Sequence, residues 1–163
     1  MSISVTQRAI DALLKSRKNL FKELKSVRNS MDVGAKTGDG WHDEGFKIGI
    51  GDEKRIASQI SAKTRQISLC NVITPEEQND IVKIGNVVEV KYLNDNTKMI
   101  FVVDGVASYE DVCSADSPLG RELLMGKKMG DVINIEGTDI SIRIEKIFLP
   151  SYYSTFKQTT KDP

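Results

Sequence analysis

The sequence predicts an α+β protein, with an N-terminal antiparallel α-helical coiled-coil hairpin followed by a small antiparallel β domain that carries one short helix. Three observations predict this fold. Apolar residues recur every three or four positions over residues 10–31 and again over 56–70. A glycine-rich and acid-rich stretch, Thr37–Phe46, separates these two periodic segments. Beyond Pro75, apolar residues alternate with polar ones, as they do in half-buried strands.

The first helix is expected over about Ser4–Met31, where apolar residues form a heptad seam that only Arg17 interrupts. Leu14 and Phe21 are expected to widen this seam. At 1.5 Å per residue the helix is roughly 40 Å long, which exceeds the radius of a small domain, so the hairpin is expected to project. The seam residues are Ile10, Leu13, Leu20, Leu24, Val27 and Met31.

The second helix is expected beyond the bend, with the same apolar spacing, so that the two seams pack antiparallel. Its seam residues are Ile56, Ile60, Ile67 and Cys70, and Lys63 stands where a further apolar residue is expected. Glycine inside a helix costs about 1 kcal/mol relative to alanine, so a regular helix is not expected across the bend. The glycines concerned are Gly34, Gly38, Gly40, Gly45, Gly49 and Gly51.

Charge changes sign at the bend of the hairpin. Residues 1–31 hold seven basic and two acidic residues, whereas residues 32–46 are acidic. The acids there are Asp32, Asp39, Asp43 and Glu44, against Lys36. A basic shaft is therefore predicted to end in an acidic tip. A second interpretation stays open, in which Asp43 and Glu44, or Asp52 and Glu53, stabilise the dipole of the second helix from its first turn.

Pro75 and the polar residues after it mark a boundary, which predicts a hairpin domain over 1–75, a sheet domain over 76–150 and a tail over 151–163. The sheet domain is expected to contain two pairs of strands. The first pair covers 88–92 and 99–103 around a turn at 94–96, and the second covers 132–136 and 140–145 around Gly137.

A short helix is expected between the two pairs of strands, with Ser117 as its cap and Pro118 in its first position. Its buried residues are Leu119, Leu123 and Leu124, and Gly126 stops it. The tail has no period and its end is expected to fray, although Tyr152, Tyr153 and Phe156 offer apolar surface for packing.

Several classes of protein are excluded by composition and motifs. No run approaches the roughly 20 apolar residues that span a bilayer. The first residues lack the apolar core of a signal peptide, so we expect a cytoplasmic protein without a membrane partner. Cys70 and Cys113 are too isolated for a disulfide framework or a zinc site and are expected to be buried. No nucleophile-and-base arrangement or cofactor fingerprint is present, so neither independent catalysis nor a cofactor of its own is expected.

The string Asp116–Val132, Asp-Ser-Pro-Leu-Gly-Arg-Glu-Leu-Leu-Met-Gly-Lys-Lys-Met-Gly-Asp-Val, follows a helical hairpin with Gly38-Asp39 in its loop. In these features the chain resembles the Gre family of bacterial transcript cleavage factors over nearly its whole length. The resemblance implies an FKBP-like sheet domain that docks on bacterial RNA polymerase, and a coiled coil that enters the secondary channel of the polymerase. Family tip carboxylates help to hold a second Mg²⁺, shared with the polymerase, which then cleaves backtracked nascent RNA. The free factor is expected to be a monomer.

The resemblance implies roles for individual residues of the tip. Asp39 matches the first family acid, but His42 stands at the position of the second, so Asp43 or Glu44 is expected to replace it. The implied catalytic carboxylates are these three acids, with Asp39 and Glu44 as the metal ligands. Trp41 and His42 are implied tip contacts, Trp41 by stacking on a base or on protein. Alternatively, Trp41 covers the end of the hairpin and His42 is a solvated loop residue.

Two further sets of contacts follow from the resemblance. Asp116, Ser117 and Pro118 match the polymerase-docking segment, and their role in starting a helix is a sufficient alternative explanation. Basic residues of the first helix are candidates for contacts with RNA or with the channel, where phosphate contacts make binding salt-dependent. These residues are Lys15, Lys18, Lys22, Lys25 and Arg28. Simple solvation of a helix face is the alternative.

Two other functions compete with transcript cleavage. The displaced second acid favours a regulator or inhibitor that occupies the same channel without supporting cleavage. The FKBP-like resemblance, taken literally, suggests a prolyl isomerase or chaperone with a helical arm. The sheet domain supplies few aromatic residues for a proline pocket, namely Tyr92, Phe101, Tyr109 and Phe148, which argues against this last function.

Overall fold

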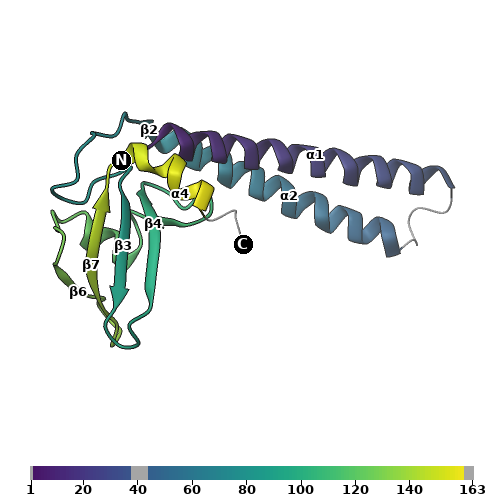
Figure 1. Cartoon of the computed structure of the whole chain (residues 1–163). Helices are drawn as coiled ribbons and strands as arrows, with labels where there is room; N and C mark the ends of the chain where they lie inside the picture. Colours follow the sequence, from purple (N-terminus) through teal and green to yellow (C-terminus); the bar gives the residue numbers. More distant parts are fainter. Residues whose placement is uncertain (1, 38–43, 160–163) are drawn as a thin grey trace. The chain divides into compact units, whose positions relative to one another are not determined.

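The computed structural model describes the backbone of residues 2–37 and 44–159, and their side chains except those of 33–37, 44, 45 and 159. The chain divides into two compact units, Met1–Ile10 with Cys70–Pro163, and Asp11–Leu69. The first unit is a sheet domain and the second is a two-helix hairpin (Figure 1). The first ten residues therefore group with the sheet, whereas the sequence pattern assigns them to the hairpin.

Two long helices form the hairpin, α1 (Gln7–Thr37), whose first residues belong to the sheet domain, and α2 (Glu44–Leu69). Leu24, Ile56 and Ile60 are buried between them, and Leu20 and Val27 pack against this cluster. The antiparallel coiled-coil hairpin expected from the apolar spacing is confirmed. Leu14 and Phe21 were expected to widen the seam, but 40% and 52% of their surface is exposed, because the contact stripe is narrow.

The expectation that glycines interrupt the helices around the bend is wrong for four of the six. Gly34 lies within α1, and Gly45, Gly49 and Gly51 lie within α2. Packing explains Gly49, since a Cβ at this position would lie 2.7 Å from Cγ of Met31. The missing side chain makes room for Met31, and the contact offsets the roughly 1 kcal/mol that glycine costs in a helix.

The sheet domain is built on a five-stranded sheet of order β5-β4-β3-β7-β6. Its strands are β3 (Val87–Tyr92), β4 (Lys98–Asp104), β5 (Val112–Ser114), β6 (Val132–Asn134) and β7 (Ser141–Phe148). The pairs β3–β4 and β6–β7 are antiparallel, as expected, and β3 also pairs antiparallel with β7, whereas β5 runs parallel to β4. Strand β5 was not expected from the sequence.

Each face of this sheet is covered by a different segment. One face packs on α3 (Pro118–Leu123) and forms the main core. That core contains Val82, Val88, Val90, Phe101, Val103, Leu123, Ile133, Ile142, Ile144 and Ile147. On the other face, Phe156 packs against Val87 and Val102. Alternation along β3 and β4 thus supplies two apolar surfaces.

The C-terminal tail is helical as far as it is described, and its last residues, 160–163, where fraying was expected, lie outside the described residues. A 3-10 turn, η1 (Pro150–Tyr152), leads into α4 (Tyr153–Thr159). Phe156 is only 4% exposed, and the rings of Phe148 and Tyr152 stack with their centroids 4.3 Å apart. The packing expected for the aromatic residues of the tail therefore holds this segment on the sheet.

A second, smaller sheet joins the two ends of the polypeptide that flank the hairpin. Strand β1 (Ile3–Val5) pairs in parallel with β2 (Cys70–Val72). The amide of Ile73 continues the pairing by donating to the carbonyl of Val5 at 2.9 Å. Neither strand was expected from the sequence. None of the helices in the described ranges is long and apolar enough to cross a membrane.

Candidate functional site

The predicted acidic tip falls almost entirely outside the residues that the structure describes. Asp39, Trp41, His42 and Asp43 lie in the undescribed stretch, and only the backbone of Glu44 is described, where it begins α2. Their proposed roles as metal ligands and tip contacts therefore stay predictions. Within the described ranges, no three His, Cys, Asp or Glu side chains gather in a way that could hold a metal ion.

The predicted docking segment forms a tight turn between β5 and α3. The hydroxyl of Ser117 donates to the carbonyl of Ser114 at 2.7 Å and accepts from the amide of Gly120 at 3.0 Å. Ser117 is therefore the N-cap of α3, as predicted, and Pro118 takes the first helical position, where no amide proton is needed. Asp116 and Pro118 are exposed beside this cap. The turn thus presents both residues on a fixed backbone.

Gly120 is a further determinant of this turn, which the sequence interpretation missed. A Cβ on Gly120 would lie 1.9 Å from the carbonyl oxygen of Ser114, closer than any side chain allows. Only glycine therefore lets the first turn of α3 lie against the end of β5. The signal in the sequence is a glycine in the first turn of a helix, where it costs about 1 kcal/mol without a packing reason.

An open groove of about 440 Å³ adjoins the docking turn. Ser117, Cys113 and Leu119 line it next to the turn, and Met99 and Ile100 line it from β4. Met99 and Ile100 keep 47% and 37% of their surface exposed. Ser117 of the predicted docking segment therefore shares this groove with partly exposed apolar side chains, which are common at the centre of protein interfaces.

Both cysteines are half-buried, so the expectation that they are buried is wrong in degree. Sγ of Cys113 lies 3.4 Å from Oγ of Ser117. Burial raises the pKa of the Cys113 thiol, and the contact with Ser117 opposes this to a smaller extent. The thiol is therefore protonated at neutral pH and is a poor nucleophile.

The predicted RNA or channel contacts on α1 are all exposed. Arg28 differs from the four lysines, because its Nε donates to Oε1 of Glu53 at 2.7 Å. In the described part of the hairpin, Lys15, Lys18, Lys22 and Lys25 form no ion pair. The lysines are therefore available to bind phosphate, whereas Arg28 is already held by a carboxylate.

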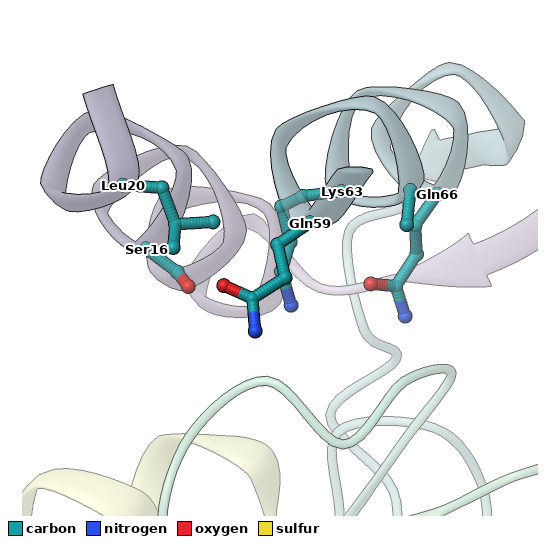
Figure 2. Close-up of a pocket in the computed structure, with 6 residues that line it drawn as sticks. Ser16, Leu20, Gln59, Lys63 and Gln66 are labelled. Atoms are coloured by element: carbon teal, nitrogen blue, oxygen red, sulfur yellow. The ribbon is translucent and has the colours of Figure 1, made fainter. Parts of the chain in front are cut away.

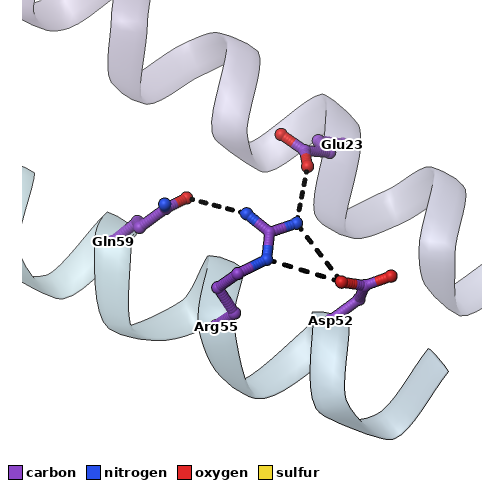
Figure 3. A network of polar contacts seen from close by, with 4 residues as sticks. All are labelled: Glu23, Asp52, Arg55 and Gln59. Carbon is purple, nitrogen blue, oxygen red and sulfur yellow. Dashed lines mark hydrogen bonds and ion pairs between the residues drawn. The ribbon is translucent and has the colours of Figure 1, made fainter. Parts of the chain in front are cut away.

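Asp52 and Glu53 contact arginine side chains away from the start of α2, whereas Glu44 is its first residue. Because α2 begins at Glu44, Asp52 and Glu53 lie in its third turn, so their suggested role at the helix dipole is wrong. The guanidinium of Arg55 lies 3.4 Å from Asp52 and 3.3 Å from Glu23 on the facing helix (Figure 3). Gln59 accepts a further hydrogen bond from Arg55 at 3.5 Å. Of these exposed contacts, the one between Arg55 and Glu23 links the two helices, and each contributes less than about 1 kcal/mol.

A buried carboxylate at the end of β4 fixes the first turn of α1 on the sheet domain. Asp104 is fully buried. The Oδ1 atom of Asp104 accepts hydrogen bonds from the amide of Thr6 at 3.0 Å and from the amide of Gly105 at 2.7 Å. The Oδ2 atom accepts from the hydroxyl of Thr6 at 2.6 Å and from the hydroxyl of Tyr109 at 2.9 Å. Burial is the main cause that raises the pKa of Tyr109, and the negative charge of Asp104 is the second.

The first turn of α1 makes a further contact with the sheet domain through Arg8. The guanidinium carbon of Arg8 lies 3.2 Å from the ring centroid of Tyr153, which is a cation–π contact.

The sequence of this chain is similar to those of known transcription elongation factors. Residues 77–148 match the protein family described as transcription elongation factor, GreA/GreB, C-term. The chain is 24% identical over 138 residues to the transcription elongation factor GreA of Thermotoga sp. (strain RQ2), covering 82% of this chain and 88% of the relative. It is 25% identical, with the same coverage, to the transcription elongation factor GreA of Thermotoga maritima.

Solved structures of similar proteins align with most of this chain. GreA factor homolog 1 (Gfh1) of Thermus thermophilus aligns with 90% of this chain and 99% of its own, at 18% identity and a TM-score of 0.43. The elongation factor GreA/GreB from Nitrosomonas europaea aligns with 91% of this chain and 98% of its own, at 14% identity and a TM-score of 0.36. The stretch that matches the family, residues 77–148, includes the docking turn Asp116–Pro118.

Proposed function

We propose that this chain, a member of the GreA/GreB family of transcription elongation factors by its sheet domain, binds bacterial RNA polymerase and stimulates cleavage of backtracked nascent RNA. The family match over residues 77–148 is the observation that carries this proposal. Sequence relatives named transcription elongation factor GreA extend the similarity to 82% of the chain. The chain is then an accessory factor, and the bonds are broken in the active site of the polymerase.

The sheet domain supplies the proposed docking contact. Asp116 and Pro118 are exposed next to a rigid cap formed by Ser117, so their positions are set before binding. Preorganisation of this kind lowers the entropic cost of association. Met99 and Ile100, exposed at the neighbouring groove, supply apolar surface to the same contact.

The hairpin supplies the proposed contact with the active centre. Helix α1 has 31 residues, and at 1.5 Å per residue it is roughly 45 Å long, sufficient to carry its end into a channel. Lys15, Lys18, Lys22 and Lys25 are exposed along it and would meet RNA phosphates or acidic groups of the channel. Nascent RNA in the elongation complex is thus a second proposed partner of a factor that is monomeric when free.

Tip carboxylates are the proposed functional groups at the end of the hairpin. Asp39, with Asp43 or Glu44, offers hard oxygen ligands of the kind that Mg²⁺ prefers, whereas His42 is a softer ligand. A Mg²⁺ ion shared with the polymerase would supply Lewis-acid stabilisation of the phosphodiester oxygens. So few ligands bind Mg²⁺ weakly alone, and activity is therefore expected only in the complex with polymerase.

Backtracked elongation complexes with labelled RNA test the proposal. The unmodified protein is expected to shorten the RNA faster than polymerase alone, and the combined substitution Asp39→Ala, Asp43→Ala and Glu44→Ala is expected to abolish the gain. Glu136→Ala with Asp139→Ala removes two exposed carboxylates of the β6–β7 loop and serves as the control. Equal cleavage by the tip variant and the unmodified protein would disprove the role of the tip acids.

A regulator that occupies the channel without cleavage is the second candidate function. The presence of His42 where the family has its second acid favours it. Binding to polymerase with cleavage no faster than that of polymerase alone would support this candidate and exclude stimulation of cleavage.

A further inference from the structure

The outer edge of β4 is only partly covered by its neighbour in the sheet. Strand β4 has seven residues, whereas β5, the edge strand beside it, pairs only with residues 102–104. In the described sheet domain, no strand lies beside residues 98–101 on this side. The sheet therefore has an open edge that is about 13 Å long, at roughly 3.3 Å per residue.

The hydrogen bonds around this open edge define which way its backbone groups point. The amide of Val103 donates at 3.0 Å to a carbonyl just before β3, whereas the amide of Val102 donates at 2.8 Å to a carbonyl just before β5. Successive residues of a strand direct their backbone groups to opposite edges, and the register of β4 on β3 is regular. The amides and carbonyls of Lys98 and Ile100 therefore point outward, where the described backbone supplies no partner.

The groove of about 440 Å³ beside the docking turn lies at this open edge, because Met99, Ile100 and Phe101 line it. Met99 shares a face of the sheet with Phe101, which packs in the core beneath α3. Ile100 shares the opposite face with Val102, which packs against the C-terminal segment. Apolar side chains from both faces therefore flank the outward backbone groups.

The groove carries no free charge. Of the described residues that line it, only Asp111 is charged, and its Oδ2 accepts from Nζ of Lys157 at 2.8 Å. Lysine side chains commonly shield exposed edge strands, but the ammonium of Lys98 is held at 2.9 Å by Glu89 of β3, on the inner side of β4. The edge is therefore open to an uncharged and largely apolar occupant.

The groove between the two helices of the hairpin, about 490 Å³ in volume, lacks these features. Side chains of both helices line it, among them Ser16, Gln59 and Lys63 (Figure 2). Helical residues direct their backbone hydrogen bonds along the helix, so no row of outward amides and carbonyls borders that groove. Recognition through the backbone is therefore possible at the edge of β4 and not between the helices.

We propose that the groove at β4 binds an extended peptide segment of a partner protein, which adds to the open edge as a strand in line with β5. Such a segment supplies hydrogen-bond partners for the backbone of Lys98 and Ile100, and its alternate apolar side chains contact Met99 and Ile100. A helix cannot fill this role, because its backbone groups are bonded within the helix. The inference goes beyond the proposed function, since it requires no polymerase.

Amide hydrogen exchange of the ¹⁵N-labelled full chain, followed by nuclear magnetic resonance, tests the proposal. The probes are three synthetic peptides that alternate threonine with valine, leucine or phenylalanine over six residues, with a lysine at each end for solubility. Saturating peptide is expected to slow exchange at Lys98 and Ile100 about ten-fold or more, because their amides become bonded. Met99 and Phe101, whose amides face β3, are the internal reference and are expected to change less.

N-methylated peptides separate backbone pairing from apolar contact. Methylation at every second residue removes the donors along one edge of an extended peptide and leaves its side chains in place. One version is methylated at the threonines and the other at the apolar residues. At least one of them is expected to bind about ten-fold more weakly than its parent peptide, because it cannot donate to the carbonyls of β4.

Two proline variants test the same pairing from the protein side. Proline is tolerated at edge positions whose amide faces outward, so Ile100→Pro removes an outward donor of β4 and is expected to weaken peptide binding about ten-fold or more. Val132→Pro is the matched control on β6, at the opposite edge of the sheet, and is expected to change binding less than about two-fold. Thermal unfolding checks that both variants are folded.

Three outcomes would overturn the proposal. The first is the absence of slowed exchange at Ile100 with every peptide. The second is equal binding by both methylated versions and their parent peptide, which would show that backbone pairing is not used. The third is slowed exchange at Ile100 without peptide as the protein concentration rises, together with dimers in sedimentation, which would make a second copy the occupant.

The exchange measurement uses the unmodified chain, so it decides the proposal even if Ile100→Pro does not fold. Polymerase is absent throughout, and none of these outcomes depends on whether the chain stimulates cleavage.

Discussion

The hydroxyl of Thr6 donates to Oδ2 of Asp104 over 2.6 Å, and the amide of the same threonine donates to Oδ1 over 3.0 Å. Thr6 precedes α1, and its own hydroxyl oxygen also accepts from the amide of Ala9 at 3.3 Å. The residue that caps α1 is thus held by a buried carboxylate of the sheet domain. Asp104 therefore joins the N-terminal segment to β4 without any covalent link.

Replacing Asp104 is expected to destabilise the sheet domain strongly. Asp104→Ala leaves the donors on Thr6, Gly105 and Tyr109 without their acceptor, which predicts a loss of about 3 kcal/mol in the free energy of unfolding. Urea denaturation followed by circular dichroism measures this loss. Asp139→Ala, at an exposed loop position, is the control and is expected to change stability by less than about 0.5 kcal/mol. A similar small change in Asp104→Ala would contradict the interpretation.

Two glycine-to-alanine substitutions are expected to have effects of opposite sign. Gly120→Ala places a Cβ against the carbonyl of Ser114 and is expected to cost about 2 kcal/mol or more, because backbone must move. Gly51→Ala, inside α2, meets no atom within 4 Å and is expected to stabilise the protein by about 0.5–1 kcal/mol. Thermal unfolding compares the two variants. A neutral Gly120→Ala would show that α3 does not need its close contact with β5.

Asp116→Ala is expected to weaken binding to RNA polymerase without altering the fold. Its carboxylate is exposed, and only its amide contacts the turn, at 3.4 Å from Oγ of Ser114. Loss of a charged contact of about 1.4 kcal/mol corresponds to a ten-fold weaker complex. Titration of polymerase with labelled protein measures the affinity, and Glu136→Ala is the control. Unchanged affinity in Asp116→Ala would remove this residue from the docking contact.

Alkylation of Cys113 is expected to be slow at neutral pH and to accelerate as the pH rises. Burial raises the pKa of this thiol above its ordinary value, so the reactive thiolate forms only in more alkaline solution. Iodoacetamide modification in a Cys70→Ser background, followed by mass spectrometry at several pH values, measures the rate. A rate that levels off below about pH 8 would show a lowered rather than a raised pKa.

The β3–β4 hairpin could be predicted from the sequence pattern, whereas the short strands β1, β2 and β5 could not. Val88 and Val90 repeat with period two, so the β3–β4 hairpin and its buried face followed from the sequence. Strands β1, β2 and β5 have three residues each, and they exist because of the partners they meet. The order of α4 likewise depends on aromatic contacts with the sheet rather than on a period of its own.

By itself, the sequence determined the elements whose causes lie within a few residues of one another. Heptad spacing produced the hairpin, and Ser117-Pro118 produced the start of α3, because side chains three or four positions apart share a helix face or a cap. Only the tertiary structure decided the roles of Asp104 and Gly120. Asp104 and Thr6 are 98 residues apart, and no local pattern records a contact that forms only when distant segments fold together.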